Sequence, residues 1–279
     1  MQVRSPLITV GGKSASAERI VSAFPPPHCY DRYVEVCGGA AHVLFYKEPY
    51  RHEEIYNDLN NNLVVFWEQI RTNADLMQQC LDDLPYSRKL YYDYYRSLFD
   101  GSRLNDLERA IRFFYVLRST GTGWIRRSPV GWNCQSSKLH SFRSASELFQ
   151  AAKERMRFVS IDNRDCVATI KRYDGPRTLF FCDPPYVGSE HYYEASRDGF
   201  DHQGLADTLN HARGFVALSY YPHPLLDDLY PAAKWRRMTW TQKKSSALKI
   251  DEDGGVHTGM ATELLLMNYS PTQGGLFDE

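Results

Sequence analysis

The amino-acid sequence predicts an α/β protein in which the strands of a parallel sheet flank a helical insert. One observation is the apolar run TLFFC (Thr178 to Cys182), whose lack of polar alternation is typical of a strand buried on both faces of a parallel sheet. A second is the order strand, glycine turn, helix, strand between residues 33 and 58. The 279 residues suit one large α/β domain with an insertion, or two modest domains.

Each expected element follows from the spacing of its apolar residues. Strands are predicted at residues 33–37, 53–58, 157–162, 178–182, 214–221 and 263–269. Helices are predicted at residues 41–46, 63–84, 104–118 and 204–212. The middle of the chain is therefore expected to be mostly helical.

The sequence argues against several kinds of protein and site. No apolar run reaches 18 residues and the start MQVRSPLITVGGK is unlike a secretory signal, so a cytoplasmic protein is expected. The six cysteines lack C-x-x-C spacing, which favours free thiols over disulfides or a zinc site. None of the nine histidines falls in a zinc-hydrolase or zinc-deaminase motif, so no metal is expected.

Basic charge is concentrated in the middle of the chain. Residues 86–157 carry 14 Lys and Arg against 6 Asp and Glu, a net charge of +8, whereas the remaining residues carry 19 against 28. Aromatic residues are interleaved with this charge, as in RKLYYDYYRSLF and TGTGWIRRSPVGWN. This composition suits a surface that neutralises phosphates and stacks against bases. On charge alone, a solvated basic face is an equal alternative.

A glycine turn near the N-terminus is a candidate ligand loop. Gly38 and Gly39 follow the first strand and precede a helix, so backbone amides can approach a ligand closely. Asp58 lies 19 residues beyond Gly39, where the acid that ends the second strand binds ribose hydroxyls in nucleotide sites. A glycine pair alone is more often a plain tight turn.

The strand TLFFC runs directly into the tetrapeptide DPPY. Pro184 and Pro185 stop strand pairing, so they hold Asp183 and Tyr186 in a stiff loop, where the tyrosine is expected to be exposed. In open parallel sheets, ligands bind at the carboxyl ends of the strands. Asp183 is therefore a second candidate site residue at the same rim.

Five motifs in one order resemble the Dam-like (D12 class) DNA adenine-N6 methyltransferases, which use S-adenosylmethionine. They are GGK (11–13), EVCGGAA (35–41), NDLN (57–60), NRDC (163–166) and DPPY (183–186). The resemblance implies a doubly wound Rossmann-like methyltransferase sheet with an inserted helical target-recognition domain, and a bacterial or phage origin. It implies a cofactor-binding catalytic domain at 1–66 and 158–270, a recognition insert at 67–157 and a flexible tail at 271–279.

The resemblance also implies roles for individual residues. The implied catalytic residues are Asp183, Pro184, Pro185 and Tyr186. The implied cofactor contacts are Gly12, Lys13, Glu35, Cys37, Gly38, Gly39, Asp58, Asp165 and Asp183, with Asp165 at the adenine of the cofactor. Contacts with double-stranded DNA are expected from Arg118, Trp124, Arg126, Arg127 and Lys138. On the residues alone, Lys13 could be a solvated loop lysine and Asp165 a strand-end turn.

Three positions depart from the family pattern. Cys37 stands where the glycine-rich loop usually has an aromatic residue, Ala41 where it has its last glycine, and Thr9 near the place of a usual tryptophan. In the insert, RSTGTGW (118–124) matches the family's recognition segment only in part. No recognition sequence is therefore carried over to this chain.

The chemistry of adenine methylation accounts for DPPY. The exocyclic amine is a poor nucleophile because its lone pair is delocalised into the ring. Acceptors must therefore hold its hydrogens while the lone pair points at the methyl group, and Asp183 and the Pro184 carbonyl are the expected acceptors. Correct positioning of the amine and the methyl group then lowers the barrier, so the reaction is expected to need no metal and no covalent nucleophile. The base has to be flipped out of the duplex, and Tyr186 is expected to stack on it.

Two other functions stay open on the sequence alone. A methyltransferase acting on cytosine N4, RNA or a protein amide would use the same geometry, although S-P-P-Y or N-P-P-Y is usual in those families. A DNA-binding protein that has lost catalysis is the other alternative.

The tail TQGGLFDE gives one further expectation. Gln273, Leu276 and Phe277 resemble the Q-x-x-L-F peptide with which bacterial proteins dock on the sliding clamp. A disordered end with two apolar anchors suits folding on binding, and a loose tail without a partner is the alternative.

Overall fold

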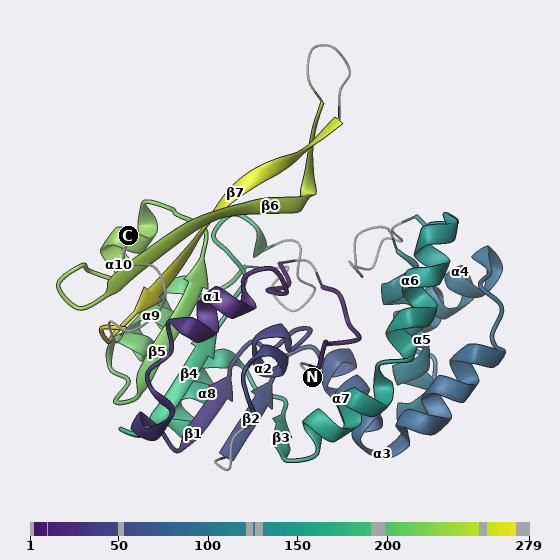
Figure 1. The fold of residues 1–279 in the computed structure, drawn as a ribbon, viewed down its shortest axis with the longest axis horizontal. Helices are drawn as coiled ribbons and strands as arrows, with labels where there is room; N and C mark the ends of the chain where they lie inside the picture. The colour runs from purple at the N-terminus through teal and green to yellow at the C-terminus, as the bar shows by residue number, and fades with distance from the viewer. Residues whose placement is uncertain are drawn as a thin grey trace.

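A seven-stranded mixed sheet forms the centre of the fold (Figure 1). The computed structural model describes residues 3–9, 11–49, 53–120, 125, 131–190, 199–250 and 256–271, without the side chains of 243–250 and 256–258. The strands are β1 (Arg32–Glu35), β2 (Glu53–Asn57), β3 (Val159–Asp162), β4 (Thr178–Cys182), β5 (Phe215–Tyr220), β6 (Arg236–Ile250) and β7 (Val256–Met267). Their order is β3-β2-β1-β4-β5-β7-β6.

The first five strands are parallel, and β7 runs antiparallel to both of its neighbours. From β1 the chain adds β2 and β3 on one side, and it then crosses to add β4 and β5 on the other. The loops that follow β1 and β4 therefore leave the sheet in opposite directions, which opens a crevice between the carboxyl ends of these two strands. This arrangement confirms the expected doubly wound Rossmann-like sheet.

Both faces of the sheet are covered by helices. On β4, Leu179 and Phe181 pack into the core on one face, whereas Phe180 and Cys182 pack into the core on the other. This alternation of fully buried residues explains the uninterrupted apolar run of TLFFC. The first face is covered by α1 (Ala17–Ser22), α2 (His42–Tyr46) and the helices that follow β2. The second face is covered by α8 (Cys166–Tyr173), α9 (His202–Asn210) and α10 (Leu225–Leu229).

The helices between β2 and β3 gather beside the β3 edge of the sheet (Figure 1). They are α3 (Asn61–Asp83), α4 (Arg88–Ser97), α5 (Asp106–Ser119), α6 (Ser136–Ser146) and α7 (Phe149–Met156). The expected boundary between residues 66 and 67 falls inside α3, because the side chain of Asn60 caps that helix and starts it at Asn61. The α3 backbone leaves helical geometry at Asn73, where φ is −131° and ψ is 24°.

Aromatic side chains form the core of this helical region. Phe66 of α3 stacks on Phe114 of α5 with ring centroids 5.9 Å apart, and Phe149 of α7 meets Phe114 edge-on at 4.8 Å. Tyr91 and Tyr95, which were expected to belong to a base-stacking surface, are buried in the same core. Aromatic residues interleaved with charge therefore pack the helices here, because the charged residues occupy the opposite helix face.

Strand β6 was not expected from the sequence. It pairs with β7 along its length, with an irregularity between Lys243 and Leu248, and the two strands project well beyond the rest of the sheet (Figure 1). The alternation of Met238 and Trp240 with threonines was the available signal, since this side of the strand faces the core. The polar residues that follow mask the pattern.

A buried group of three charges joins the helical region to the sheet. Glu54 of β2 accepts hydrogen bonds from Lys47 Nζ at 2.7 Å and from both terminal nitrogens of Arg155, at 2.7 and 3.0 Å. The three residues are 2, 2 and 7% exposed, respectively. Arg155 also donates to the Leu44 carbonyl at 2.7 Å, so one arginine from α7 holds β2 and α2. Removing one charge from such a group leaves the others buried without compensation.

We expect Glu54→Gln to lower the free energy of unfolding by about 3–5 kcal/mol, because two buried cations lose their counter-charge. Urea denaturation of the purified protein measures this change.

The neighbouring residue provides a matched control. Glu53 on the same strand pairs with Arg32 at 2.6 Å, but this pair is partly exposed to solvent. Glu53→Gln should therefore change the free energy of unfolding by less than about 1 kcal/mol. Equal losses in the two variants would show that the buried charges do not stabilise the fold in this way.

Candidate active site

A cavity of about 740 Å³ opens at the carboxyl ends of β1, β2 and β4. Residues of the N-terminal segment, α5, α8 and α9 complete its walls. The structure brings all of the expected cofactor residues to this one cavity: Gly12, Lys13, Glu35, Cys37, Gly38, Gly39, Asp58, Asp165 and Asp183. Of the expected catalytic residues, Asp183 and Pro185 line the cavity.

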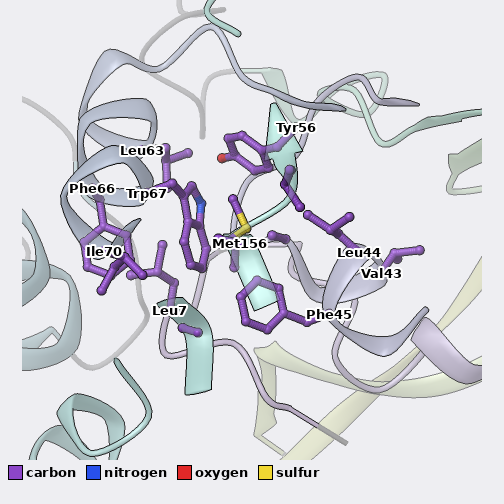
Figure 2. Close-up of a cluster of buried hydrophobic side chains, with 14 of the residues drawn as sticks. Leu7, Val43, Leu44, Phe45, Tyr56, Leu63, Phe66, Trp67, Ile70 and Met156 are labelled. Atoms are coloured by element: carbon purple, nitrogen blue, oxygen red, sulfur yellow. The ribbon is translucent and has the colours of Figure 1, made fainter. Parts of the chain in front are cut away.

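The glycine turn after β1 is packed tightly against the core beneath it. A Cβ atom on Gly38 would lie 2.2 Å from the Tyr56 ring, so only glycine fits at this position. The Tyr56 hydroxyl donates to the Gly39 carbonyl at 2.8 Å. Figure 2 shows Tyr56 and Trp67 in the hydrophobic cluster that supports the turn, and Trp67 lies 5.3 Å from Phe45 between ring centroids. The loop is thereby held open toward the cavity.

The turn uses left-handed backbone at two positions. Gly39 has φ +50° and Ala41 has φ 56° and ψ 30°. Ala41 is the position at which this chain departs from the family's glycine, so the chain accepts a left-handed alanine there at about 1 kcal/mol or more. The departure therefore keeps the conformation of the loop, because Ala41 adopts the geometry that a glycine would.

Asp58 closes the turn from the end of β2. Its Oδ2 accepts a hydrogen bond from the Gly39 amide at 2.8 Å, and its Oδ1 accepts one from the Asn60 amide at 2.8 Å. Burial raises the pKa of Asp58, and these two amide hydrogen bonds oppose the rise. The carboxylate therefore both shapes the loop and presents its edge to the cavity.

Asn57 and Asp165 fix the NRDC loop that follows β3. The buried Asn57 amide donates to the carbonyls of Val36 and Arg164 at 2.8 and 3.0 Å and accepts from the Arg164 amide at 2.9 Å. Asp165 caps α8 by accepting from the Ala168 amide at 2.9 Å, and its side chain is exposed. Asp165 therefore takes part in the turn that follows β3, as the alternative interpretation expected, and it also lines the cavity.

Glu35 lies deeper than the other acids of the rim. It is 2% exposed and accepts a hydrogen bond from the Tyr33 hydroxyl at 2.7 Å. Burial raises its pKa to about 8, although the Tyr33 hydroxyl and the Leu44 amide oppose the rise. Burial therefore shifts Glu35 toward its protonated form.

The side chains of Cys37 and Cys166 are hydrogen-bonded to each other in the cavity wall. The pKa of the Cys37 thiol is raised, chiefly by its hydrogen bond with Cys166 and to a lesser extent by burial. Both are free cysteines that line the cavity. Cys37 thus fills the place of the family's aromatic residue with a smaller side chain.

Lys13 and Asp183 form an ion pair in the cavity wall. Lys13 Nζ lies 2.8 Å from Asp183 Oδ1, and the two side chains are 4 and 18% exposed. The alternative of a solvated loop lysine is therefore wrong. Burial raises the pKa of Asp183 to about 6, and the charge and hydrogen bond of Lys13 oppose that rise.

Tyr186 is buried rather than exposed. Only 6% of its surface is accessible, because its hydroxyl turns inward to Ser219 Oγ at 2.8 Å and Glu263 Oε2 at 2.9 Å. Lys13 Nζ lies 4.9 Å from the centre of the Tyr186 ring, and the Tyr221 ring packs edge-on at 4.5 Å. The expectation of an exposed tyrosine failed because the sequence gives no sign of the polar partners that draw the hydroxyl inward.

Of the expected DNA contacts, Arg118 and Lys138 lie in the part of the chain that the structure describes. Arg118 is 8% exposed and donates to the carbonyl and hydroxyl oxygens of Ser141 at 2.6 and 2.7 Å, so it is a buried helix-packing residue and does not face DNA. Lys138 is half-buried. Its pKa is lowered to about 8, chiefly by burial and also by the positive charge of Arg118. Trp124, Arg126, Arg127 and the tail residues 273–279 lie outside the described residues.

Several cavity residues could not be found by motif. Phe113 and Leu117 of α5 form an apolar wall, and Asp201 and Thr208 come from the α9 region. His42 also lines the cavity, and burial together with the charges of Lys13 and Arg118 lowers its pKa to about 4. These residues reach the cavity through tertiary packing, which leaves no local pattern in the sequence.

The fold and the motifs at its rim define a Rossmann-like methyltransferase. Residues 10–243 match the family model described as D12 class N6 adenine-specific DNA methyltransferase, and the chain belongs to this family. No curated protein matches the chain. The family establishes an enzyme that methylates adenine N6 in DNA, and it implies the use of S-adenosylmethionine.

The cavity fits this cofactor. Ionisable acids along the wall, Asp58, Asp165, Asp183, Asp201 and Asp207, suit a ligand that carries a sulfonium and an ammonium group. Gly38 leaves room for a ligand to approach the backbone closely, and Asp58 lines the same cavity. Among the described residues, no group of three or more His, Cys, Asp and Glu could hold a metal ion, and no helix is long and apolar enough to cross a membrane.

Replacing each glycine of the turn by alanine should have unequal effects. Gly39→Ala should lower the free energy of unfolding by about 1 kcal/mol, because its left-handed φ resembles that of Ala41 and no atom lies closer than Thr9 Oγ1 at 3.6 Å. Gly38→Ala should cost about 2–3 kcal/mol through collision with Tyr56. Urea denaturation of both variants tests the order, and a larger loss for Gly39→Ala would contradict it.

Proposed function

We propose that the rim cavity binds S-adenosylmethionine beside a flipped adenine, with Asp183 as the acceptor that activates the adenine amine. The ion pair between Lys13 and Asp183 in the wall of this cavity is the observation that carries the proposal. Asp58 would hold the ribose, Asp165 the adenine of the cofactor, and the turn of Gly38 and Gly39 the methionine portion. The cofactor supplies a methyl group activated by positive sulfur.

Asp183 and Pro184 provide the two acceptors that the chemistry requires. The Asp183 carboxylate takes one hydrogen of the amine, and the Pro184 carbonyl takes the other, so the nitrogen lone pair is directed toward the methyl group. Lys13 fixes the orientation of Asp183 from behind and keeps its carboxyl in the charged form. The negative charge then stabilises the positive charge that develops on the nitrogen.

Tyr186 borders the same site. Because Lys13 lies over its ring and only 6% of the residue is exposed, a base that stacked on that face would have to displace the lysine side chain. We therefore propose that Tyr186 acts first as a fixed wall behind Asp183, with base stacking on its ring requiring movement of Lys13.

The acid of DPPY and the intact cavity support catalysis at adenine over the two alternatives. A chain that had lost catalysis would not need to bury a lysine against Asp183, since burying charges is unfavourable. Sequencing that detects modified bases in DNA from cells expressing the protein reports the modified base and its sequence context together, and absence of adenine methylation would favour an inactive DNA-binding protein.

Contact of the helices α3–α7 with DNA remains a proposal, supported by the net charge of +8 on residues 86–157. Docking of Gln273, Leu276 and Phe277 on a sliding clamp also stays a prediction. Loss of clamp binding on deletion of residues 273–279 would support it.

Asp183→Ala should reduce single-turnover methyl transfer by about a hundredfold or more, while the cofactor and the duplex still bind. The lost interaction belongs mainly to the transition state. The duplex should carry the site found by sequencing, and calorimetry measures cofactor binding in the same variant.

Asp58→Asn is the matched comparison at the other end of the cavity. It should weaken cofactor binding, because the neutral side chain no longer accepts from both the Gly39 and Asn60 amides and a ribose. Near-normal transfer by Asp183→Ala would overturn the catalytic assignment, and unchanged cofactor affinity in Asp58→Asn would overturn the placement of the cofactor.

The rate should fall in acid because Asp183 must be ionised. Its pKa is raised by burial to about 6, so kcat/KM should be constant above that pH and fall up to tenfold per pH unit below it. A pH series under subsaturating DNA measures this limb. A fall that began only near pH 4 would show that Asp183 titrates as an ordinary exposed aspartate.

A further inference from the structure

We infer that Glu263, on the strand where the projecting hairpin leaves the sheet, is a positioning residue that holds the catalytic tetrapeptide through the hydroxyl of Tyr186. The inference rests on the proposed function of Asp183. It adds a residue from β7, far from the five sequence motifs, to the machinery of methyl transfer.

Glu263 is an acid surrounded by hydrogen-bond donors. It is 2% exposed. Its Oε2 accepts from the Tyr186 hydroxyl at 2.9 Å and lies 3.4 Å from Ser219 Oγ, and its Oε1 accepts from Gln242 Nε2 at 2.9 Å. A buried carboxylate with this many donors fixes the geometry of each donor, because charge-assisted hydrogen bonds are short and strong.

The contacts of Glu263 belong to a closed ring of polar contacts. This ring links β7, β6, the N-terminal segment and the DPPY loop. Gln242 of β6 accepts from the Ser16 hydroxyl at 2.5 Å, and the Ser16 amide donates to the Lys13 carbonyl at 3.0 Å. Lys13 then pairs with Asp183 and lies over the Tyr186 ring. The hydrogen bond from the Tyr186 hydroxyl to Glu263 closes the ring. Both ends of the catalytic tetrapeptide are therefore held by polar contacts from outside the loop.

Glu263 lies where the β6–β7 hairpin leaves the sheet, and it contacts the DPPY loop from there. Pairing between β5 and β7 reaches Leu264, which lies opposite Tyr220, and Glu263 is the next residue toward the hairpin. Beyond this point β6 and β7 continue as the projecting pair of strands (Figure 1). The hairpin and the catalytic loop are thus joined where the hairpin leaves the sheet.

Removing the charge should slow methyl transfer without preventing binding. Glu263→Gln keeps the size of the side chain, but its amide can no longer accept from both Tyr186 and Gln242. We expect kcat to fall about tenfold, while the KM for DNA and the affinity for S-adenosylmethionine change less than about twofold. Glu53→Gln, which makes the same change at the exposed pair with Arg32, is the matched control.

A pH series separates positioning from loosened packing. The ionisable groups that act on Asp183 come from several elements: Lys13, Glu35, Cys182, Tyr186, Tyr221 and Glu263. The negative charge of Glu263 favours the protonated form of Asp183. Glu263→Gln should therefore move the acidic limb of kcat/KM to lower pH, whereas a packing defect alone would lower the rate at every pH and leave the limb in place.

The Tyr186→Phe background tests whether Glu263 acts through the hydroxyl. If it does, Glu263→Gln should lower kcat much less in Tyr186→Phe than in the wild type, because the hydrogen bond is already lost. The exchange Glu263→Gln with Gln242→Glu restores the amide–carboxylate pair, so it should recover thermal stability but leave kcat low.

The outcomes also separate this inference from the proposed function. Suppose that the wild type is active and that Glu263→Gln has the same kcat and the same acidic limb as the wild type. That result would overturn the inference about Glu263 but not the proposed function. Full activity of Asp183→Ala would overturn the proposed function, whatever Glu263→Gln does. Equal kcat losses from Glu263→Gln in both backgrounds would show that Glu263 does not act through Tyr186.

Discussion

The pairing of β1 with β4 is the constraint on which the site depends. These strands are neighbours in space, yet β2, β3 and the helical region α3–α7 separate them in the chain. Their register places Glu35 beside Phe181, so the glycine turn and the DPPY tetrapeptide begin one or two residues apart on the same rim. Side-chain contacts then fix each loop in place, but the pairing of the two strands before them is what brings the loops side by side.

Strand ends and tight turns could be read from the sequence because their causes are local. Asp58 and Asp183 follow apolar strands, and Gly38 and Gly39 stand between a strand and a helix, so each left a pattern within a few residues. The inward turn of Tyr186 and the burial of Arg118 have distant causes. Ser219, Glu263 and Ser141 lie 33, 77 and 23 residues away from the side chains that they hold. Composition alone therefore assigned the wrong environment to both.

The distribution of charge is more ordered than the net charge of −1 suggests. Acids collect along the cavity, and there are two buried groups of opposite charges, one at Asp183 in the cavity wall and one at Glu54 between the sheet and the helical region. Glu35 is the exception, since burial favours its protonated form. A rim rich in carboxylates thus coexists with a stable fold because burial favours the neutral form of the deepest acid and the others are paired, hydrogen-bonded or open to solvent.

The kink at Asn73 gives α3 the geometry of a lever. The helix begins at the cavity wall, where Asn60 caps it and Leu63 lines the cavity, and its 23 residues extend about 34 Å into the helical region. The ten residues after Asn73 form an arm of about 15 Å, so a bend of about 10° at the kink would swing the far end by about 2.6 Å. A small change of angle at Asn73, partway along the helix, would in this way displace the far end of the arm by nearly the length of a hydrogen bond.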